Sequence, residues 1–370
     1  MAERVLLLVI TNRRMKRYEK KEISSEMEKL IDSSGGKTVS VLTASVDRPS
    51  PASYIHSGKV GELKTAVARE RPDLVICSVD LSPTQLRNIE KATNKRVVDR
   101  TGLILDIFAH HATTHEGKLQ IELAQLNYLL PRLSDIWEQF SRLGGGIGTR
   151  GPGEQKLEID RRKIKTKITK LKKELDALRA HRARIRQQRR RQQLFVITIV
   201  GYTNAGKSTL LNQLTGASVL AQDKLFATLD PTTRRLFVDA GMQVLITDTV
   251  GFLRELPHTL IEAFKATLEE ITESDLILDV IDISDEFYED KRQAADKVLA
   301  DVGAGQIGRI LVLNKSDMLT DAMRIRVKRT YPQAVLISAR SGYGIEVLRG
   351  QIKQRLEKKA AHHEHYHSVS

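Results

Sequence analysis

Short apolar runs alternate with amphipathic stretches over the first 112 residues. Each run holds a few consecutive residues rich in Leu, Ile and Val, which is typical of strands buried on both faces of a parallel sheet. The runs occupy residues 4–10, 38–43, 74–79 and 96–98, and the amphipathic stretches occupy 19–31, 60–69, 82–92 and 101–110. This alternation predicts an N-terminal α/β domain, residues 1–112, built on a parallel sheet.

One segment of this domain, Ser57-Gly58-Lys59-Val60-Gly61-Glu62, has a partial likeness to a phosphate-binding loop. The pattern is short and incomplete. A helix start that carries a solvated lysine is the better interpretation.

Residues 113–193 carry two stretches in which apolar residues recur with helical spacing. In the first stretch they follow one another in steps of four and three: Leu119, Leu123, Leu126, Leu130, Leu133, Trp137 and Phe140. In the second they recur every seven residues: Leu157, Ile164, Leu171, Leu178 and Ile185. These heptad patterns predict that the two stretches pack on each other as an antiparallel helical hairpin, a coiled coil. Pro131 is expected to kink the first arm.

A glycine-rich loop, residues 144–153, joins the two arms and holds six glycines in ten residues. That composition excludes a regular element. Two interpretations remain open: a flexible connection, or a loop that moulds against a partner surface with Arg150 as its anchor.

Apolar runs return from residue 194 onward and predict strands at 194–200, 236–239, 243–248, 309–313 and 335–337. Ala240-Gly241 would join the second and third of these as a tight hairpin. A helix is predicted at 345–358. Together these elements predict a domain, residues 194–358, with a twisted, mostly parallel sheet covered by helices on both faces. The His-rich residues 359–370 are predicted to form a disordered tail.

The charge distribution changes the picture of the second helical arm. The chain carries a formal net charge of +14, and residues 151–193 hold 16 Lys or Arg against 5 Asp or Glu. A solvated helix usually mixes the two signs, so contact with a phosphate backbone is the better explanation. Aromatic residues are absent from this arm, which favours recognition of folded RNA by charge and shape. The expected contacts are Arg179, Arg182, Arg184, Arg186, Arg189, Arg190 and Arg191.

Composition otherwise indicates an ordinary globular protein, with 41% hydrophobic and 29% charged residues. Every apolar run falls short of the roughly 18 residues that a membrane span needs, and the N-terminus lacks the features of a signal peptide. The single cysteine, Cys77, excludes an internal disulfide and is expected to be a buried structural residue. We therefore expect a cytoplasmic protein, monomeric and without integral membrane association.

The chemistry is concentrated in Gly201-Tyr202-Thr203-Asn204-Ala205-Gly206-Lys207-Ser208, a full match to the phosphate-binding loop G-x-x-x-x-G-K-[ST]. It follows a predicted strand and precedes an amphipathic helix. Consecutive backbone N–H groups and the positive helix end can bind an anion, and Lys207 can reach the outer phosphates. Ser208 can ligate Mg²⁺.

Three further motifs follow predicted strands in the order that a GTPase requires. Asp248-Thr249-Val250-Gly251 offers a carboxylate for the Mg²⁺ shell, through water, and a Gly251 N–H for a γ-phosphate. Asn314-Lys315-Ser316-Asp317 offers a carboxylate that can accept two hydrogen bonds from guanine, and a site built around such a buried acceptor rejects adenine. Ser338-Ala339-Arg340 offers backbone N–H groups for the guanine O6. The set predicts a P-loop GTPase with a Ras-like fold.

One departure from Ras-like switches concerns mechanism. Phe252 follows the Gly251 of this motif, at the position of a water-orienting glutamine. Phenylalanine cannot position water, so we expect slow intrinsic hydrolysis that a partner or a rearranged switch accelerates. Asn204 in the phosphate loop is similar to the asparagine of GTPases that recruit K⁺ as an additional cation.

With these residues in place, the chain resembles the HflX family of ribosome-associated GTPases over residues 1–356. The most specific segments are GYTNAGKSTLLN (201–212), LFATLDPTTR (225–234), DTVGFLRELPH (248–258) and AFKATLEE (263–270). Similar segments upstream are DRTGLILDIFA (99–109), KLQIELAQLNYLLPRL (118–133) and GGGIGTRGPGE (144–154). The last of these favours partner contact for the glycine-rich loop.

The resemblance implies roles for further residues. Thr228 becomes the candidate for a switch-one threonine that ligates Mg²⁺, with Thr232 and Thr233 as competing choices. Lys207, Thr228 and Gly251 are then the residues expected to act in catalysis. Thr209 and Phe226 are expected to join the phosphate-loop and guanine motifs in binding the nucleotide.

The resemblance also implies a function. A member of this family is expected to bind the large ribosomal subunit and its RNA and, with GTP bound, to split or rescue stalled ribosomes. The alternatives are a GTPase that assists assembly of the large subunit, or a regulatory switch that acts away from ribosomes. Bacterial members commonly carry a further small C-terminal domain, whose contacts are not assumed for this chain.

Overall fold

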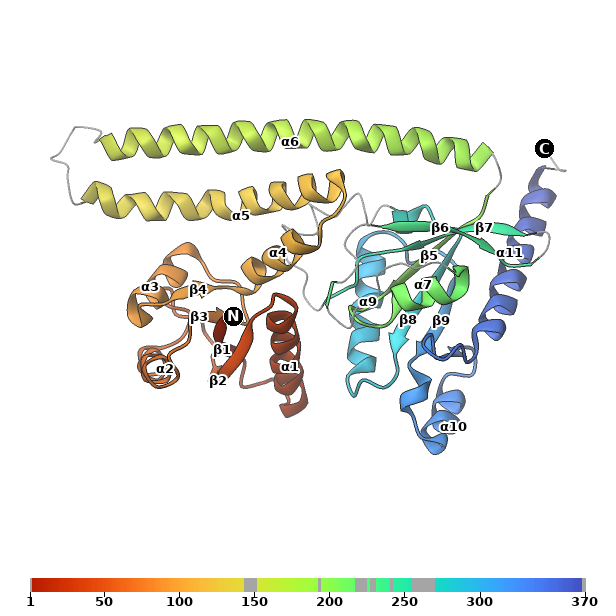
Figure 1. Cartoon of the computed structure of the whole chain (residues 1–370), viewed down its shortest axis with the longest axis horizontal. Helices are drawn as coiled ribbons and strands as arrows, with labels where there is room; N and C mark the ends of the chain where they lie inside the picture. The colour runs from red at the N-terminus through yellow and green to blue at the C-terminus, as the bar shows by residue number, and fades with distance from the viewer. Residues whose placement is uncertain are drawn as a thin grey trace. The chain divides into compact units, whose positions relative to one another are not determined.

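The computed structural model describes residues 2–142, 152–191, 194–216, 225–226, 231–239, 242–253 and 270–367. Side chains are described for these residues except 134–142, 152–157, 185–191 and 362–367. The chain forms two compact units, residues 1–176 and 177–370, and the division falls within the long helix α6 (Pro152–Arg191) (Figure 1).

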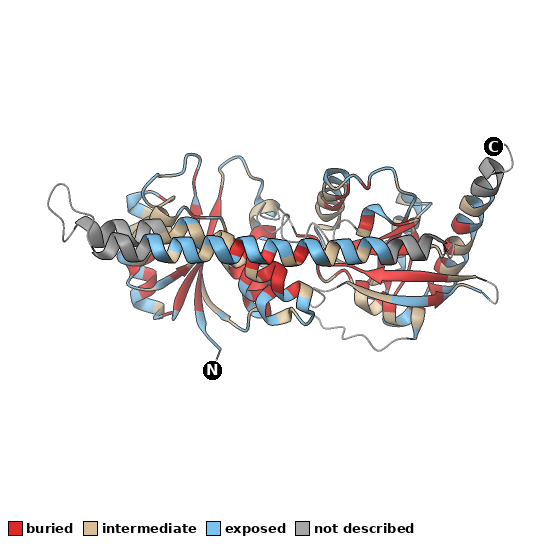
Figure 2. Ribbon diagram, turned by 90° about the horizontal axis from the view of Figure 1, so that it is seen from above, coloured by how far each residue is buried: buried red, intermediate tan, exposed pale blue. Residues whose placement is uncertain are grey.

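The first unit contains the predicted parallel sheet, with four strands in the order β2-β1-β3-β4. Its strands are β1 (Arg4–Thr11), β2 (Lys37–Ser45), β3 (Leu74–Cys77) and β4 (Arg96–Val98). The helices between and after them are α1 (Arg17–Ser33), α2 (Ser57–Glu70), α3 (Pro83–Thr93) and α4 (Arg100–His111). The two central strands are buried almost throughout, which confirms that continuous apolar runs marked strands covered on both faces (Figure 2). Cys77 is buried, and burial raises the pKa of its thiol, as expected for a structural cysteine.

Local chemistry explains where the helices of this unit begin. The Ser82 side chain accepts a hydrogen bond from the Gln85 N–H, and Pro83 follows it at the first helical position. Helix α2 begins at Ser57, and its Lys59 pairs with Glu62 at 2.6 Å. The segment Ser57–Lys59 is therefore a helix start, as predicted.

The predicted hairpin is present as α5 (His115–Arg142) and α6, which run antiparallel (Figure 1). The predicted heptad residues Leu119, Leu123 and Leu171 are buried, and so are Ile168 and Leu175, which lie between the heptad positions of the second arm. An ion pair between Lys167 and Glu122 joins the two helices. Helix α5 continues through Pro131. Residues 144–151 of the glycine-rich loop lie outside the described residues, and its last two residues, Pro152 and Gly153, belong to the first turn of α6.

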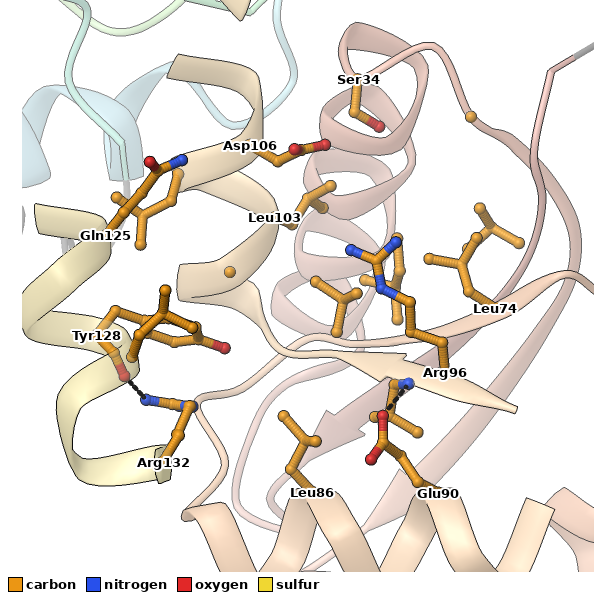
Figure 3. Close-up of a pocket in the computed structure, with 18 of the residues that line it drawn as sticks. Ser34, Leu74, Leu86, Glu90, Arg96, Leu103, Asp106, Gln125, Tyr128 and Arg132 are labelled. Atoms are coloured by element: carbon orange, nitrogen blue, oxygen red, sulfur yellow. Dashed lines mark hydrogen bonds between the residues drawn. The ribbon is translucent and has the colours of Figure 1, made fainter. Parts of the chain in front are cut away.

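A buried carboxylate attaches α5 to the first sheet. Asp99, at the start of α4, accepts hydrogen bonds from the Leu81 and Gly102 N–H groups, at 3.3 and 2.8 Å. The Tyr128 hydroxyl and the Arg132 guanidinium, both on α5, donate to the same carboxylate at 2.7 Å each. No local sequence pattern marked this cluster. Tyr128 and Arg132 also line a cavity of about 610 Å³ beside the edge strand β4 (Figure 3).

The second unit holds a six-stranded sheet in the order β10-β9-β8-β5-β7-β6. Its strands are β5 (Val196–Gly201), β6 (Thr232–Phe237), β7 (Gln243–Asp248), β8 (Leu276–Asp282), β9 (Arg309–Asn314) and β10 (Val335–Leu336). Its helices are α7 (Lys207–Thr215), α9 (Tyr288–Asp301), the 3₁₀ turn η1 (Ser316–Met318), α10 (Asp321–Thr330) and α11 (Ile345–His367). Among the described strands β6 alone runs antiparallel, so the sheet is mostly parallel as predicted.

Helices cover both faces of this sheet. Apolar residues of α7 and α11, including Leu210 and Leu348, pack with Ile199 and Leu278 on one face. Tyr288 of α9 and Val327 of α10 pack with Ile281 on the other face. In the part of the chain that the structure describes, no helix has the length and apolar character needed to cross a membrane.

Strand β8 and helices α9 and α10 were not predicted from the sequence, and two predicted elements differ most in their bounds. Strand β6 begins at Thr232 rather than at residue 236, because the polar residues Thr232–Arg235 already pair with β7. The tail was predicted to be disordered from residue 359, yet α11 continues to His367. No glycine or proline interrupts the sequence there, and Lys359 pairs with Asp275 at 2.7 Å, which holds the helix beyond its last apolar turn.

Candidate nucleotide-binding site

The phosphate loop forms where β5 ends and α7 begins, at the carboxyl edge of the sheet. Gly201 has φ of +147°, and a Cβ there would lie 2.1 Å from the Val280 carbonyl oxygen. Gly206 has φ of +90°, and a Cβ there would lie 2.3 Å from Asn314 Nδ2. Both glycines are therefore required by backbone conformation and by close packing, as the motif predicted.

Lys207 is the first residue of α7 and is only 6% exposed. Its Nζ donates to the Tyr202 carbonyl oxygen at 3.0 Å. Burial lowers the pKa of this ammonium group to about 8, and the nearby Asp248 carboxylate opposes the shift. A phosphate bound at the loop would favour the charged amine, so the geometry suits an anion at this position.

Ser208 and Asp248 come together as predicted. The Ser208 hydroxyl donates to Asp248 Oδ2 at 2.6 Å, and Asp248 is fully buried at the end of β7. A hydroxyl and a carboxylate are the hard oxygen donors that Mg²⁺ prefers. The residues present therefore fit a Mg²⁺ site beside the phosphate loop.

Gly251 lies directly against the phosphate loop. A Cβ on Gly251 would lie 2.7 Å from the Thr203 Cα and 2.9 Å from the Lys207 Nζ, so a larger residue would collide with both. This placement brings the Gly251 backbone close to Lys207, the residue predicted to reach the outer phosphates.

The side chain of Phe252 is buried in the interior and is 1% exposed. Its N–H donates to the Gly201 carbonyl at 3.0 Å, and its carbonyl accepts from the Thr203 N–H at 2.9 Å. The aromatic side chain is thus a packing residue, and the backbone of Phe252 holds the end of the Asp248–Gly251 motif against the phosphate loop.

Asn314 ties the guanine-recognition loops to the phosphate loop. Its Nδ2 donates to the Ala205 carbonyl at 2.8 Å, and its Oδ1 accepts from the Ala339 N–H at 2.9 Å. One buried amide therefore connects three of the predicted motifs.

The other guanine-motif residues lie beside Asn314. Lys315 has φ of +63° and pairs with Asp282 at 2.7 Å. Asp317 lies in η1 and is exposed, whereas the sequence had predicted a buried acceptor at this position. Ser338 and Ala339 are buried, and Arg340 is exposed.

The remaining predicted contacts are not all described. Thr228 lies outside the described residues, and Phe226 is buried with φ of +60°. Thr232 and Thr233 lie in β6, where the Thr233 hydroxyl bonds the Thr247 hydroxyl at 2.9 Å. Thr209 follows Ser208 in α7, and Asn204 has φ of +61°.

The predicted RNA contacts differ in exposure. Arg184 is exposed, whereas Arg179 and Arg182 are half-buried and Arg182 pairs with Glu270 at 3.3 Å. Arg150 lies outside the described residues. Helix α6 extends through Arg191, so Arg186, Arg189, Arg190 and Arg191 are helical, with side chains outside the described set.

Two contacts that hold residues of the site in place were not predicted from the sequence. Asp282 ends β8 and holds Lys315, and the only signal was a carboxylate at the end of an apolar run. Lys291 of α9 lies 5.2 Å from the centre of the Tyr202 ring, a cation–π contact between residues 89 positions apart. No local sequence pattern predicts such a contact.

Family models match three consecutive parts of the chain. Residues 21–109 match the model described as GTP-binding GTPase N-terminal, and 111–189 match GTP-binding GTPase Middle Region. Residues 196–315 match the model described as 50S ribosome-binding GTPase.

Relatives are similar over almost the whole chain. GTPase HflX of Caldanaerobacter subterraneus subsp. tengcongensis is 47% identical over 357 residues, which cover 96% of this chain and 81% of the relative. GTPase HflX of Escherichia coli (strain K12) is 45% identical over 340 residues, which cover 91% of this chain and 80% of the relative. The solved structure of SsGBP in complex with GDP is 27% identical, with a TM-score of 0.53 and coverage of 95% of this chain and 98% of that one. The chain described here belongs to the HflX family of GTPases.

Proposed function

We propose that this GTPase binds the large ribosomal subunit in its GTP state and splits or rescues stalled ribosomes. One observation carries the proposal: the phosphate-loop and guanine motifs occur in the same chain as a long, strongly basic helix. The description of the matched GTPase model, 50S ribosome-binding GTPase, supports the same partner.

The basic arm supports contact with ribosomal RNA. Along α6, several cations are exposed and make no ion pair with any described residue: Arg161, Lys165, Lys172, Lys173 and Arg184. Unpaired cations on a rigid helix can replace the counterions of an RNA backbone, and this exchange drives salt-dependent association. Arg182 contributes less to this surface because Glu270 already neutralises it.

The nucleotide site supplies the switch. Lys207 would bind the outer phosphates, and the Gly251 N–H would meet the γ-phosphate that distinguishes GTP from GDP. Ser208, Thr228 and, through water, Asp248 would hold Mg²⁺, which neutralises charge on the β- and γ-phosphates when bound. Asn204 is the phosphate-loop residue through which K⁺ would be recruited.

Hydrolysis is expected to be slow without a partner. Phe252 is buried and bonded to the phosphate loop through its backbone, so its side chain leaves the attacking water unoriented. A water-orienting or charge-stabilising group contributed by the ribosome would lower the barrier. Ribosome-stimulated turnover follows from this arrangement.

Charge reversal on the arm tests the proposal. The triple variant Arg186→Glu, Arg189→Glu, Arg190→Glu should lose most ribosome stimulation of GTP hydrolysis, with unchanged turnover in the absence of ribosomes. The matched control reverses three exposed cations of α10: Arg326, Lys328 and Arg329. Equal stimulation of the arm variant, the control and the unmodified chain would contradict the proposal and favour a switch that acts away from ribosomes.

A further inference from the structure

A second cavity lies in the GTPase unit, apart from the nucleotide motifs, with a volume of about 370 Å³. Its walls come from β8, β9, α9, α11 and residues 330–334. Strand β10 pairs only with Val312 and Leu313 of β9, so the first half of β9 lacks a neighbouring strand on that side. The cavity borders this uncovered stretch of the sheet.

A buried carboxylate lies on the cavity wall. Asp279, in the middle of β8, is 3% exposed, and its Oδ1 is buried without a hydrogen-bond partner. Its Oδ2 lies 3.8 Å from the nearest guanidinium nitrogen of Arg309, beyond hydrogen-bonding distance. Desolvation raises the pKa of this carboxyl group to about 6, and Arg309 opposes the shift. A buried acceptor without a hydrogen bond destabilises the folded protein. A hydrogen-bond donor placed in the cavity would therefore stabilise Asp279.

Three arginines share the cavity wall, and they differ in their partners. Arg309 pairs with Asp296 at 2.5 Å, and Arg292 pairs with Asp296 at 3.4 Å. Arg355, on α11, is exposed and makes no ion pair with any described part of the chain. It is therefore the cation of this wall that remains available to an anion.

These groups define the chemistry of an occupant. An ammonium group beside Asp279 would also meet Arg309, a like charge, so a neutral hydroxyl donor suits this acceptor better. Carboxylates commonly accept hydrogen bonds from sugar hydroxyls, and guanidinium groups bind phosphates in a fork geometry. The volume lies at the small end of the range of ligand sites, about 300–1,000 Å³.

We propose that this cavity binds a small sugar phosphate, whose hydroxyl groups donate hydrogen bonds to Asp279 and whose phosphate is bound by Arg355. The site is separate from the GTP site and adds a second ligand to the GTPase unit. The cavity offers a buried acceptor, Asp279, and an exposed cation, Arg355. A sugar alone would bind only the first, and a phosphate alone would bind only the second.

Calorimetric titration of the full chain, saturated with GDP and Mg²⁺ to occupy the nucleotide site, tests this proposal with ribose 5-phosphate as the probe. Ribose 5-phosphate should bind at least about tenfold more tightly than ribose or inorganic phosphate. Asp279→Asn and Arg355→Gln should each weaken binding by about tenfold or more, whereas Arg326→Gln on α10 should leave it unchanged. Unaltered GDP affinity in each variant would show that the fold is intact.

AMP, which carries the same sugar phosphate, identifies the source of the ligand. Tighter binding of AMP than of ribose 5-phosphate supports a nucleotide as the source, and the reverse supports a free sugar phosphate. The proposal is overturned if neither probe binds at about 10 mM, or if both cavity variants bind as the unmodified chain does. In either case water would be what satisfies Asp279.

Discussion

Lys207 shows how one residue couples the nucleotide site to pH. Its ammonium group is buried against the Tyr202 carbonyl, and burial lowers its pKa to about 8. Nucleotide phosphates interact only with the charged form, so they raise the pKa on binding and favour protonation. We therefore expect the amine to lose its charge at a lower pH in the free protein than in the nucleotide complex.

The affinity for GDP is therefore expected to fall as pH rises above about 8, by about tenfold per pH unit until the pKa of the bound state is reached. Below that pH the amine is already charged and affinity should be flat. Titrating a fluorescent GDP analogue between about pH 7 and about pH 9 measures this change. Lys207→Met should bind weakly at every pH, without the decline. A constant affinity of the unmodified chain across this range would contradict the proposed role of the buried amine.

At the scale of elements, the Asp99 cluster determines how α5 attaches to the first sheet. The carboxylate is fully buried and accepts from two backbone N–H groups and two α5 side chains. The Arg132 guanidinium also donates to the Tyr128 and Leu81 carbonyl oxygens at 2.9 and 3.1 Å, and lies 3.5 Å from the Tyr128 ring centre. The first arm of the hairpin is therefore held by a charged contact as well as by apolar packing.

Asp99→Ala is expected to lower the free energy of local opening of α5 by about 3–5 kcal/mol, because it leaves the Arg132 charge without its carboxylate. Tyr128→Phe removes one hydrogen bond and should cost about 1–2 kcal/mol. Amide hydrogen exchange along α5 measures both effects, and unchanged GDP binding shows that the GTPase unit is intact. Equal exchange rates in the two variants would rule out a dominant charge contribution.

The sequence predicted all four strands of the first sheet and five of the six strands of the second, because buried parallel strands appear as continuous apolar runs and the phosphate-loop motif follows one of them. The central strand β8 was not predicted, although it is also a continuous apolar run. It could not predict the Asp99 cluster, since Asp99 and Arg132 are 33 residues apart and each occurs in an unremarkable local pattern. The predicted end of α11 was wrong because the polar, His-rich stretch has no periodic apolar residues that would indicate a helix. The support of Lys315 by Asp282 was missed for the same reason as Asp99: it depends on tertiary contact.

At the scale of the whole molecule, charge and switch chemistry point to the same partner. The net charge of +14 is concentrated in residues 151–193, and α6 presents exposed cations without ion pairs among the described residues. A surface of this kind binds RNA with strong salt dependence. Under the proposed function, the burial of Phe252 would allow GTP to bind without rapid turnover, which would leave time for a GTP-dependent action on the ribosome.

The proposed ribosomal function can be tested by sedimentation of the protein with purified ribosomes in the presence of a non-hydrolysable GTP analogue, GDP or the matching ATP analogue. We expect the protein to co-sediment with large subunits only with the GTP analogue, and we expect intact ribosomes to dissociate into subunits. Binding that leaves ribosomes intact would favour an assembly role on the same partner. No nucleotide-dependent binding in any of the three conditions would contradict the ribosomal function proposed for this GTPase.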